Sequence, residues 1–192
     1  MAQAERIAFG VLIGLIFLAQ LAALVGLLSR GKRAENGSAW ALVGAWYALL
    51  GASMLEAWRF PHFWPAPAWL APVGAALFLL GAGLRAAAVR ALRRHFSPMV
   101  ELQPEHQLVT EGVYGRLRHP AYLGSLAWAL SVPLMLESAA GLVVFVAAYL
   151  PALGYRIAVE ERMLADHFGP AWTAYSARVP ALLPRLWGRQ AT

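Results

Sequence analysis

Five long apolar stretches divide this sequence and set the framework of its fold. A helix needs about 20 mainly apolar residues to cross the hydrocarbon core of a membrane. The stretches that meet or approach this length are residues 7–28, 40–58, 69–92, 121–136 and 139–157. Because the core of a bilayer holds no water, each spanning segment must satisfy its own backbone hydrogen bonds, as a helix does. We therefore predict an all-α integral membrane helical bundle with about five transmembrane helices.

The composition agrees with this interpretation. The chain is 60% hydrophobic and 14% charged, whereas about a quarter of the residues in a soluble domain are charged. Its 192 residues suit one membrane domain, residues 1–192. The first stretch is too long for the core of a secretory signal and no small-residue cleavage site follows it, so we interpret it as a retained span. The last two stretches are separated only by Glu137 and Ser138, which predicts a tight helical hairpin.

The basic residues predict the orientation of the bundle. Cytoplasmic loops of membrane proteins carry an excess of Lys and Arg. With five spans, all of the 16 Lys and Arg residues except Arg6 and Arg59 fall on one side. We therefore expect the N-terminus outside and the C-terminus in the cytoplasm. Two polar segments, about 95–120 and 158–192, then lie on the cytoplasmic side, where we expect the C-terminal half to form a cofactor pocket.

The residue types present limit the chemistry of such a pocket. The chain contains no cysteine, which excludes disulfide bonds, thiolate metal sites and a cysteine nucleophile. No nucleophile–base triad is evident, and we predict no metal site. The net charge of +6 lies at the ends of apolar stretches, so we predict no nucleic acid partner. His, Tyr, Arg and Glu gather in the polar segments, and this clustering argues against a non-enzymatic membrane scaffold or carrier.

The segment from Gly112 to Gly124 is polar, aromatic and rich in glycine, and it leads directly into an apolar stretch. Pro120 suits the first turn of the following helix, where its missing N–H is not needed. His119 is then expected beside the helix N-terminus, whose exposed amides can receive an anionic group such as a carboxylate. Taken alone, the segment fits an ordinary interfacial loop equally well.

Arg156 and Glu160 lie at the end of the last apolar stretch and are four residues apart, so they share one face of a helix. One interpretation is a simple ion pair at the end of a span. The other is that Arg156 holds an anionic acceptor while Glu160 faces a cationic cofactor. Taken alone, the spacing favours the ion pair, whereas the position suits a lipid-borne head group that meets the cytoplasm there.

A third segment carries aromatic residues at helical spacing, namely Phe168, Trp172 and Tyr175. This spacing is typical of an amphipathic helix lying on a membrane surface. The same helix would also be able to cover a bound cofactor.

Taken in order, these segments resemble the isoprenylcysteine carboxyl methyltransferase family. The order is G-V-Y, R-H-P-x-Y-x-G, an apolar hairpin, R-x-x-x-E-E, and F-G-x-x-W-x-x-Y followed by V-P. The resemblance covers about His106 to Pro184. It extends to the wider group of small membrane methyltransferases that includes phospholipid N-methyltransferases. It implies S-adenosyl-L-methionine as the cofactor and a lipophilic or lipidated acceptor in the membrane.

The resemblance also implies roles for individual residues. Those that match cofactor-contacting positions of the family are His106, Gln107, Leu108, Val109, Tyr114, His119, Pro120, Ala121, Tyr122 and Glu160. Arg156 matches the arginine placed against the acceptor, and we expect it and His119 to be the catalytic residues. One position departs from the pattern, because Met99 stands where eukaryotic members have a cofactor-contacting glutamine.

The acceptor decides which acid–base chemistry is needed. The resemblance most directly implies carboxyl O-methylation of an isoprenylcysteine-like substrate. A carboxylate is ionised at neutral pH and needs no general base, and Arg156 could bind it through two hydrogen bonds. An amine acceptor, as for a phospholipid N-methyltransferase, must lose a proton, and His119 or Glu160 is then the candidate base. A membrane sterol reductase using NADPH shares a similar C-terminal arrangement, but such enzymes usually have more spans before it.

Overall fold

The computed structural model describes residues 37–60, 66–92 and 108–183, together with Glu5, Ala8 and Val11. All regular structure within these residues is helical. The elements in chain order are α2 (Gly37–Arg59), α3 (Leu70–Leu92), the short 3-10 turn η2 (Gly112–Gly115), α4 (Pro120–Met135), α5 (Ala139–Val144), the π-helical turn η3 (Phe145–Tyr149), α6 (Leu150–Phe168) and α7 (Pro170–Arg178). The all-α prediction is therefore confirmed for the described chain. Apart from Ala8 and Val11, the predicted span 7–28 lies outside the described residues.

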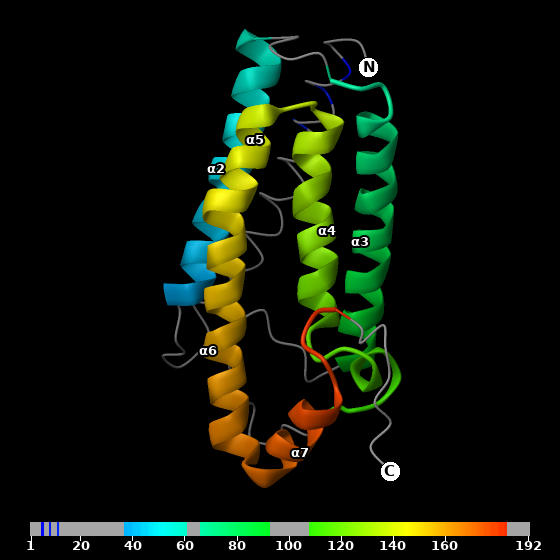
Figure 1. Ribbon diagram of the computed structural model, residues 1–192, viewed down its shortest axis with the longest axis vertical. Helices are drawn as coiled ribbons and strands as arrows, with labels where there is room; N and C mark the ends of the chain where they lie inside the picture. The colour runs from blue at the N-terminus through cyan, green and yellow to red at the C-terminus, as the bar shows by residue number, and fades with distance from the viewer. Residues whose placement is uncertain are drawn as a thin grey trace.

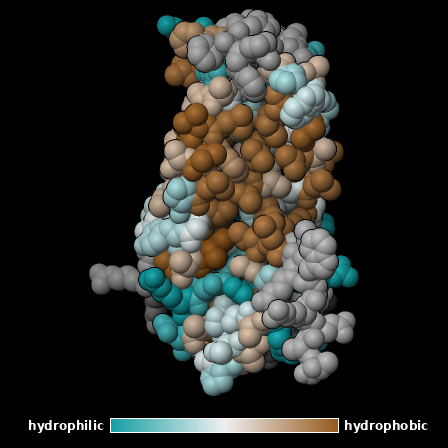
Figure 2. Space-filling view, viewed as in Figure 1, coloured by the Kyte–Doolittle hydropathy of each residue, from teal (hydrophilic) through white to brown (hydrophobic). Residues whose placement is uncertain are grey.

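The other four predicted spans correspond to helices. α2 and α3 have 23 residues each, and α5, η3 and α6 form one helix from Ala139 to Phe168. These three helices are long and apolar enough to cross a membrane, whereas α4 has 16 residues. The last helix is longer than the predicted span 139–157, and its polar final turns lie at the hydrophilic end of the molecule (Figures 1 and 2).

The arrangement of the helices brings several chain segments together at this hydrophilic end. α4 stands between α3 and the long α5–α6 helix, and α2 packs against α5 and α6 (Figure 1). α3 and α6 both run toward the hydrophilic end, and α4 begins there. η2 packs against α3, and α7 folds back from the end of α6. The polar end of the bundle is therefore built from the start of α4, the end of α6, η2 and α7.

α3 and α4 lie close together because both carry glycine where they cross. A Cβ atom added to Gly81 would lie 2.6 Å from the carbonyl oxygen of Gly124, and one added to Gly124 would lie 2.7 Å from that of Gly81. Small residues of this kind let membrane helices pack backbone to backbone. This contact fixes the height of α4 relative to α3.

The predicted hairpin between α4 and α5 is present. Glu137 has a positive φ of 51°, and the Ser138 hydroxyl caps α5 by accepting from the Gly141 N–H. The buried carboxylate of Glu56 on α2 accepts from the Ser138 hydroxyl at 2.6 Å and from the Ala140 N–H at 2.7 Å. The hairpin turn is thus fastened to α2 at the end of the bundle opposite to the polar end.

The apolar core lies between α2, α4 and the long helix, around fully buried residues such as Leu49, Val132 and Leu153. The long helix contains a π-helical turn, in which the Leu150 N–H bonds to the carbonyl oxygen of Phe145, five residues back. Pro151 follows at once and has no N–H to offer the preceding turn. The wide turn shifts the register of the helix beyond it and so contributes to the direction in which the side chains of α6 point.

Candidate functional site

The Arg118-His119-Pro120 segment leads into α4, and the predicted placement of Pro120 and His119 at the start of this helix is confirmed. Pro120 occupies the first turn of the helix and His119 is the residue that caps it. The His119 side chain is buried, with 3% of its surface exposed. The backbone N–H groups of Arg118 and His119 donate to the carbonyl oxygens of Pro180 and Ala181 at 2.9 and 3.0 Å. The chain that follows α7 is therefore held directly against the start of α4.

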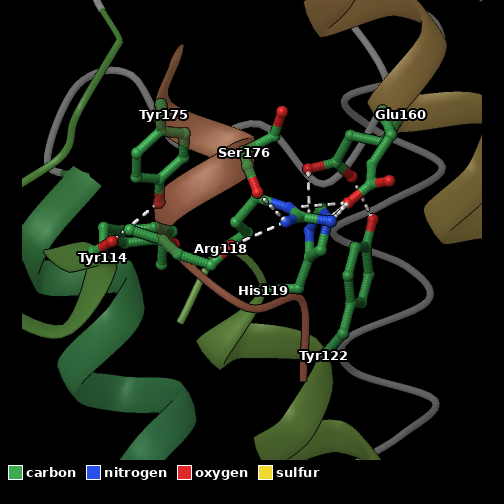
Figure 3. Close-up of polar contacts among 9 residues, drawn as sticks. Tyr114, Arg118, His119, Tyr122, Glu160, Tyr175 and Ser176 are labelled. Carbon is green, nitrogen blue, oxygen red and sulfur yellow. Dashed lines mark hydrogen bonds and ion pairs between the residues drawn. The ribbon is translucent and has the colours of Figure 1, made fainter. Parts of the chain in front are cut away.

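Arg118 ties three segments of the chain together (Figure 3). Its Nη1 donates to the carbonyl oxygens of Ser176 and Val179, at 2.8 and 2.6 Å. Its Nε and Nη2 lie 2.9 and 2.7 Å from Oε1 of Glu161 on α6. A guanidinium offers five N–H donors in a fixed plane, which suits several acceptors at once. Arg118 thus holds α7 and α6 in place around the start of α4.

His119 faces two adjacent carboxylates. Its Nε2 lies 3.0 Å from Oε1 of Glu161, and its Nδ1 lies 3.9 Å from Oε1 of Glu160. A proton on Nε2 lets the imidazole donate to Glu161. Glu161 therefore receives both Arg118 and His119, whereas Glu160 stays beside the ring with 27% of its side chain exposed.

One hydroxyl joins Arg156 and Glu160. Tyr122 on α4 donates to Oε2 of Glu160 and accepts a hydrogen bond of 3.0 Å from Nε of Arg156. Arg156 is buried, with 3% exposed, and its Nη1 donates to the Ser38 hydroxyl of α2 at 3.2 Å. Arg156 and Glu160 do share one face, as predicted, but they meet through a tyrosine instead of forming the simple ion pair that was the alternative.

Two buried tyrosines connect α7 to η2. The Tyr175 hydroxyl donates to the carbonyl oxygen of Tyr114 at 2.7 Å. Burial raises the pKa of Tyr175 to about 12, although the nearby charge of Arg118 opposes the shift. Burial and then the negative charge of Glu160 raise the pKa of Tyr114, and Arg85 opposes this. Both phenols therefore remain neutral hydrogen-bonding groups, and Tyr114 lies within electrostatic reach of Glu160.

The structure corrects the interpretation of Phe168, Trp172 and Tyr175 as one helical face. Gly169, with a φ of 52°, separates the end of α6 from α7, so Phe168 belongs to α6. Trp172, Tyr175 and the following Val179 are nevertheless buried in one small apolar cluster, against which Phe168 packs together with Leu108 and Leu164. The apolar face of α7 is therefore covered by the chain itself and does not form a free membrane-facing surface.

The described residues bring most of the predicted site residues to one place. Tyr114, His119, Tyr122 and Glu160 lie together at the polar end (Figure 3). Arg156 is joined to them through Tyr122, and Pro120 and Ala121 are in the first turn of α4. Leu108 and Val109 precede η2, and Leu108 contacts the α7 cluster. His106, Gln107 and Met99 lie outside the described residues.

The sequence assigned no role to Glu161, Ser38 or Ser176, which the structure adds to this region. Glu161 and Arg118 stood within the recognised motifs, yet only the fold shows that they pair. Ser38 had no signal of any kind, because its contact with Arg156 joins residues 118 positions apart. In the part of the chain that the structure describes, no three His, Asp or Glu residues are grouped so as to hold a metal ion.

The geometry is that of a polar wall at the end of an apolar bundle, formed by residues of η2, α4, α6 and α7. A buried guanidinium can bind a carboxylate, and a partly exposed carboxylate beside it can face a cation. Such an arrangement can hold two oppositely charged groups close together without offering a nucleophile of its own.

Comparison with known proteins places the chain in a family. A model of the isoprenylcysteine carboxyl methyltransferase (ICMT) family matches residues 74–166. Protein-S-isoprenylcysteine O-methyltransferase B of Arabidopsis thaliana is 34% identical over 118 residues, which cover 60% of each chain. A probable protein-S-isoprenylcysteine O-methyltransferase of Oryza sativa subsp. indica is 31% identical over 136 residues, covering 68% of this chain and 69% of the relative.

A solved structure agrees with these relatives. The eukaryotic intramembrane Ras methyltransferase ICMT superposes with a TM-score of 0.58 and 28% sequence identity, over 80% of this chain and 54% of that one. The chain thus spans 60% of the length of its Arabidopsis relative and about half of the solved enzyme. From the matched family region, the similarity along the Oryza relative and the shared fold, it follows that the chain belongs to the isoprenylcysteine carboxyl methyltransferase family.

Proposed function

We propose that this protein is a membrane methyltransferase that uses S-adenosyl-L-methionine to methylate the carboxylate of a lipophilic acceptor, such as an isoprenylcysteine. The observation that carries the proposal is the hydrogen-bonded series Arg156–Tyr122–Glu160 at the polar end of an apolar helical bundle. It sets a buried cation and a partly exposed anion side by side, at the depth where a lipid-borne carboxylate and a water-soluble cofactor can meet.

The residues present fit this cofactor. S-adenosyl-L-methionine, when bound, supplies a methyl group already activated by a positively charged sulfonium. The carboxylate of Glu160 has 27% of its side chain exposed beside His119, and so offers a negative group to a cationic ligand. The buried phenol of Tyr114 and the start of α4 lie close to that carboxylate. We assign cofactor binding to Tyr114, His119, Tyr122 and Glu160, and to the preceding segment His106–Val109.

Arg156 is assigned to the acceptor. Its guanidinium comes from α6 and is directed between α4 and α2, as its bonds to Tyr122 and Ser38 show. A carboxylate bound to this guanidinium is already ionised, so it can accept the methyl group without a base to remove a proton. The protein then has only to hold donor and acceptor in line and to exclude water, which accounts for much of the rate in such reactions.

The proposed orientation places this pocket on the cytoplasmic side, with the N-terminus outside. The cofactor then enters from the cytoplasm, whereas the acceptor enters sideways from the bilayer. The start of the short apolar helix α4 lies beside the polar turns of α6, and this position supports both proposed routes.

Transfer of a radiolabelled methyl group to a farnesylated cysteine analogue tests the proposal. Purified protein in detergent or nanodiscs is expected to form a base-labile methyl ester, and Glu160→Gln is expected to weaken cofactor binding, measured by isothermal titration. Asp166→Asn, which removes an exposed acid from the same helix, is the matched control.

Two results would contradict the proposal. The first is an absence of S-adenosyl-L-methionine binding by the unmodified protein, particularly if NADPH binds instead. The second is base-stable methylation of a phospholipid amine with no ester formed, which would assign the chain to lipid N-methylation.

A further inference from the structure

Arg85 on α3 is a second guanidinium that faces the interior of the bundle. It lies on the same helical face as Gly81 and Ala88, which are four positions before it and three after it, and both are buried. Its backbone touches α4, since a Cβ added to Gly124 would lie 2.9 Å from the Arg85 nitrogen. Arg90 on the same helix is exposed. The position of Arg85 is therefore that of an inward-facing residue, and it does not simply reach out to the membrane surface.

Within the described part of the chain, the contacts of Arg85 include no negatively charged group. Its Nη1 donates to the Ser125 hydroxyl at 2.8 Å, and that hydroxyl donates in turn to the carbonyl oxygen of Ala121. Among the residues that the structure describes, the recorded ion pairs are made by Arg118, His119, Glu160 and Glu161, and none includes Arg85. A guanidinium bound only to a neutral hydroxyl retains donors that a carboxylate can use.

The surroundings of Arg85 join it to the candidate site. Ser125 lies one helical turn beyond Tyr122 on α4, so the two share a face. Tyr149 on the long helix donates to the backbone oxygen of Ser125. The charges of both Arg85 and Glu160 act on the hydroxyl of Tyr114. Arg85 thus lies on the α3 side of the same polar wall whose α6 side carries Arg156 and Glu160.

The positive and negative charges of this polar wall do not balance. Glu161 is paired with Arg118, and Glu160 is joined to Arg156 through Tyr122. Arg85 remains as a surplus positive charge in the described wall. An ionisable residue that faces the interior of a membrane bundle without a counter-ion is costly to keep and is a candidate functional residue.

We propose that Arg85 is a carboxylate-binding residue of this pocket, which receives a ligand carboxylate through its free guanidinium donors while Ser125 holds it in place. This inference rests on the proposed function. Two ligands offer such a group, the amino-acid end of the methyl donor and the acceptor itself, and their shared chemistry is a carboxylate. A planar fork of N–H donors matches that group in two parallel hydrogen bonds.

Isothermal titration on the purified full chain separates the two sources. The probes are S-adenosylhomocysteine and 5′-methylthioadenosine, which lacks the amino-acid end. If the donor's carboxylate binds Arg85, Arg85→Gln weakens the affinity for S-adenosylhomocysteine by about 10- to 100-fold, the range for losing a charged hydrogen bond. Its affinity for 5′-methylthioadenosine stays the same. If the acceptor's carboxylate binds there, both nucleoside affinities stay the same and the KM for the farnesylated cysteine analogue rises by the same factor.

Arg90→Gln is the matched control, since it removes an exposed arginine from the same helix, and it is expected to change neither quantity. Should Arg85→Gln fail to fold, Arg85→Lys keeps the charge but not the planar fork, and a loss of at least threefold in either quantity is expected.

An equal loss of affinity for both nucleosides would overturn the role of Arg85. So would unchanged values of both nucleoside affinities and of the KM for the acceptor. Failure of the proposed function looks different, because the unmodified protein would then bind no S-adenosylhomocysteine and transfer no methyl group. A protein that binds and methylates normally but is indifferent to Arg85 refutes this inference alone.

Discussion

The hydroxyl of Tyr122 donates to the carboxylate of Glu160 while it accepts from Arg156. The Glu160 carboxylate and the Arg156 guanidinium, which face the proposed ligands, are therefore oriented by one oxygen atom from another helix. The hydroxyl is not a proposed reactant, so its contribution is to position the two charged groups.

Tyr122→Phe is expected to remove both hydrogen bonds without changing the packing of the ring. Leaving two charged groups each short of a partner costs about 1–3 kcal/mol of stability, and a small displacement of the reacting groups lowers kcat by up to about 100-fold. Thermal unfolding in detergent and initial rates of methyl transfer measure the two effects. Tyr155→Phe, an exposed tyrosine of α6, is the control, and equal effects of the two substitutions would contradict the positioning role.

Glu161→Gln is expected to loosen the segment that follows α7. Glu161 receives Arg118 and His119, and Arg118 holds the carbonyl oxygens of Ser176 and Val179. Losing the charge weakens the orientation of Arg118. Hydrogen exchange of the Arg118 and His119 amides, which are bonded to residues 180 and 181, should become faster. Unchanged exchange at these two amides would show that Glu161 does not support the segment.

Glu56→Ala is expected to destabilise the bundle at the end opposite to the candidate site. The substitution leaves the Ser138 hydroxyl and the Ala140 N–H without their acceptor, at a cost of about 1–3 kcal/mol. Glu56→Gln should cost less, since its amide oxygen can still accept both bonds. Thermal unfolding ranks the two variants. The KM for the acceptor should stay the same in both at temperatures where they are folded, and a raised KM would contradict a purely structural role.

Gly81→Ala is expected to push α3 and α4 apart. The new Cβ would lie 2.6 Å from the Gly124 oxygen and 2.9 Å from the Trp128 nitrogen, and overpacking of this kind costs about 1–3 kcal/mol. Gly83→Ala on the same helix is a matched control, because nothing lies within 4 Å of its Cβ position. A lower unfolding temperature for the first variant only is the expected result. Similar unfolding temperatures of the two variants would contradict the close crossing of α3 and α4.

Apolar length predicted the described helices well. α2 extends the predicted span 40–58 by a few residues, and α3 matches the predicted span 69–92 closely. The hairpin turn lies at Glu137 and Ser138, as predicted. These features follow from local pattern, since each spanning segment must be a helix. The continuation of α6 to Phe168 was missed, because charged and histidine residues interrupt the apolar residues of 158–168 and leave no long apolar run.

The candidate site could be predicted only in part, because its contacts join distant residues. The shared face of Arg156 and Glu160 follows from their spacing on one helix. Their link through Tyr122 joins α4 to α6, and no periodicity encodes it. The pairing of Arg118 with Glu161 and the break at Gly169 depend likewise on how segments pack after they form. The expected roles of His106 and Gln107 stay predictions, as do the assigned ligands.

The bonds from Arg118 and His119 to residues 176–181 have a consequence for the order of synthesis. Translation proceeds at about 5–20 residues per second, and N-terminal parts begin to fold first. Arg118 and Glu161 are therefore synthesised before Ser176, Val179 and Pro180, with which Arg118 bonds in the folded chain. The polar wall is completed only when α7 has left the ribosome and folded back, so a nascent bundle without α7 is not expected to hold the proposed ligands.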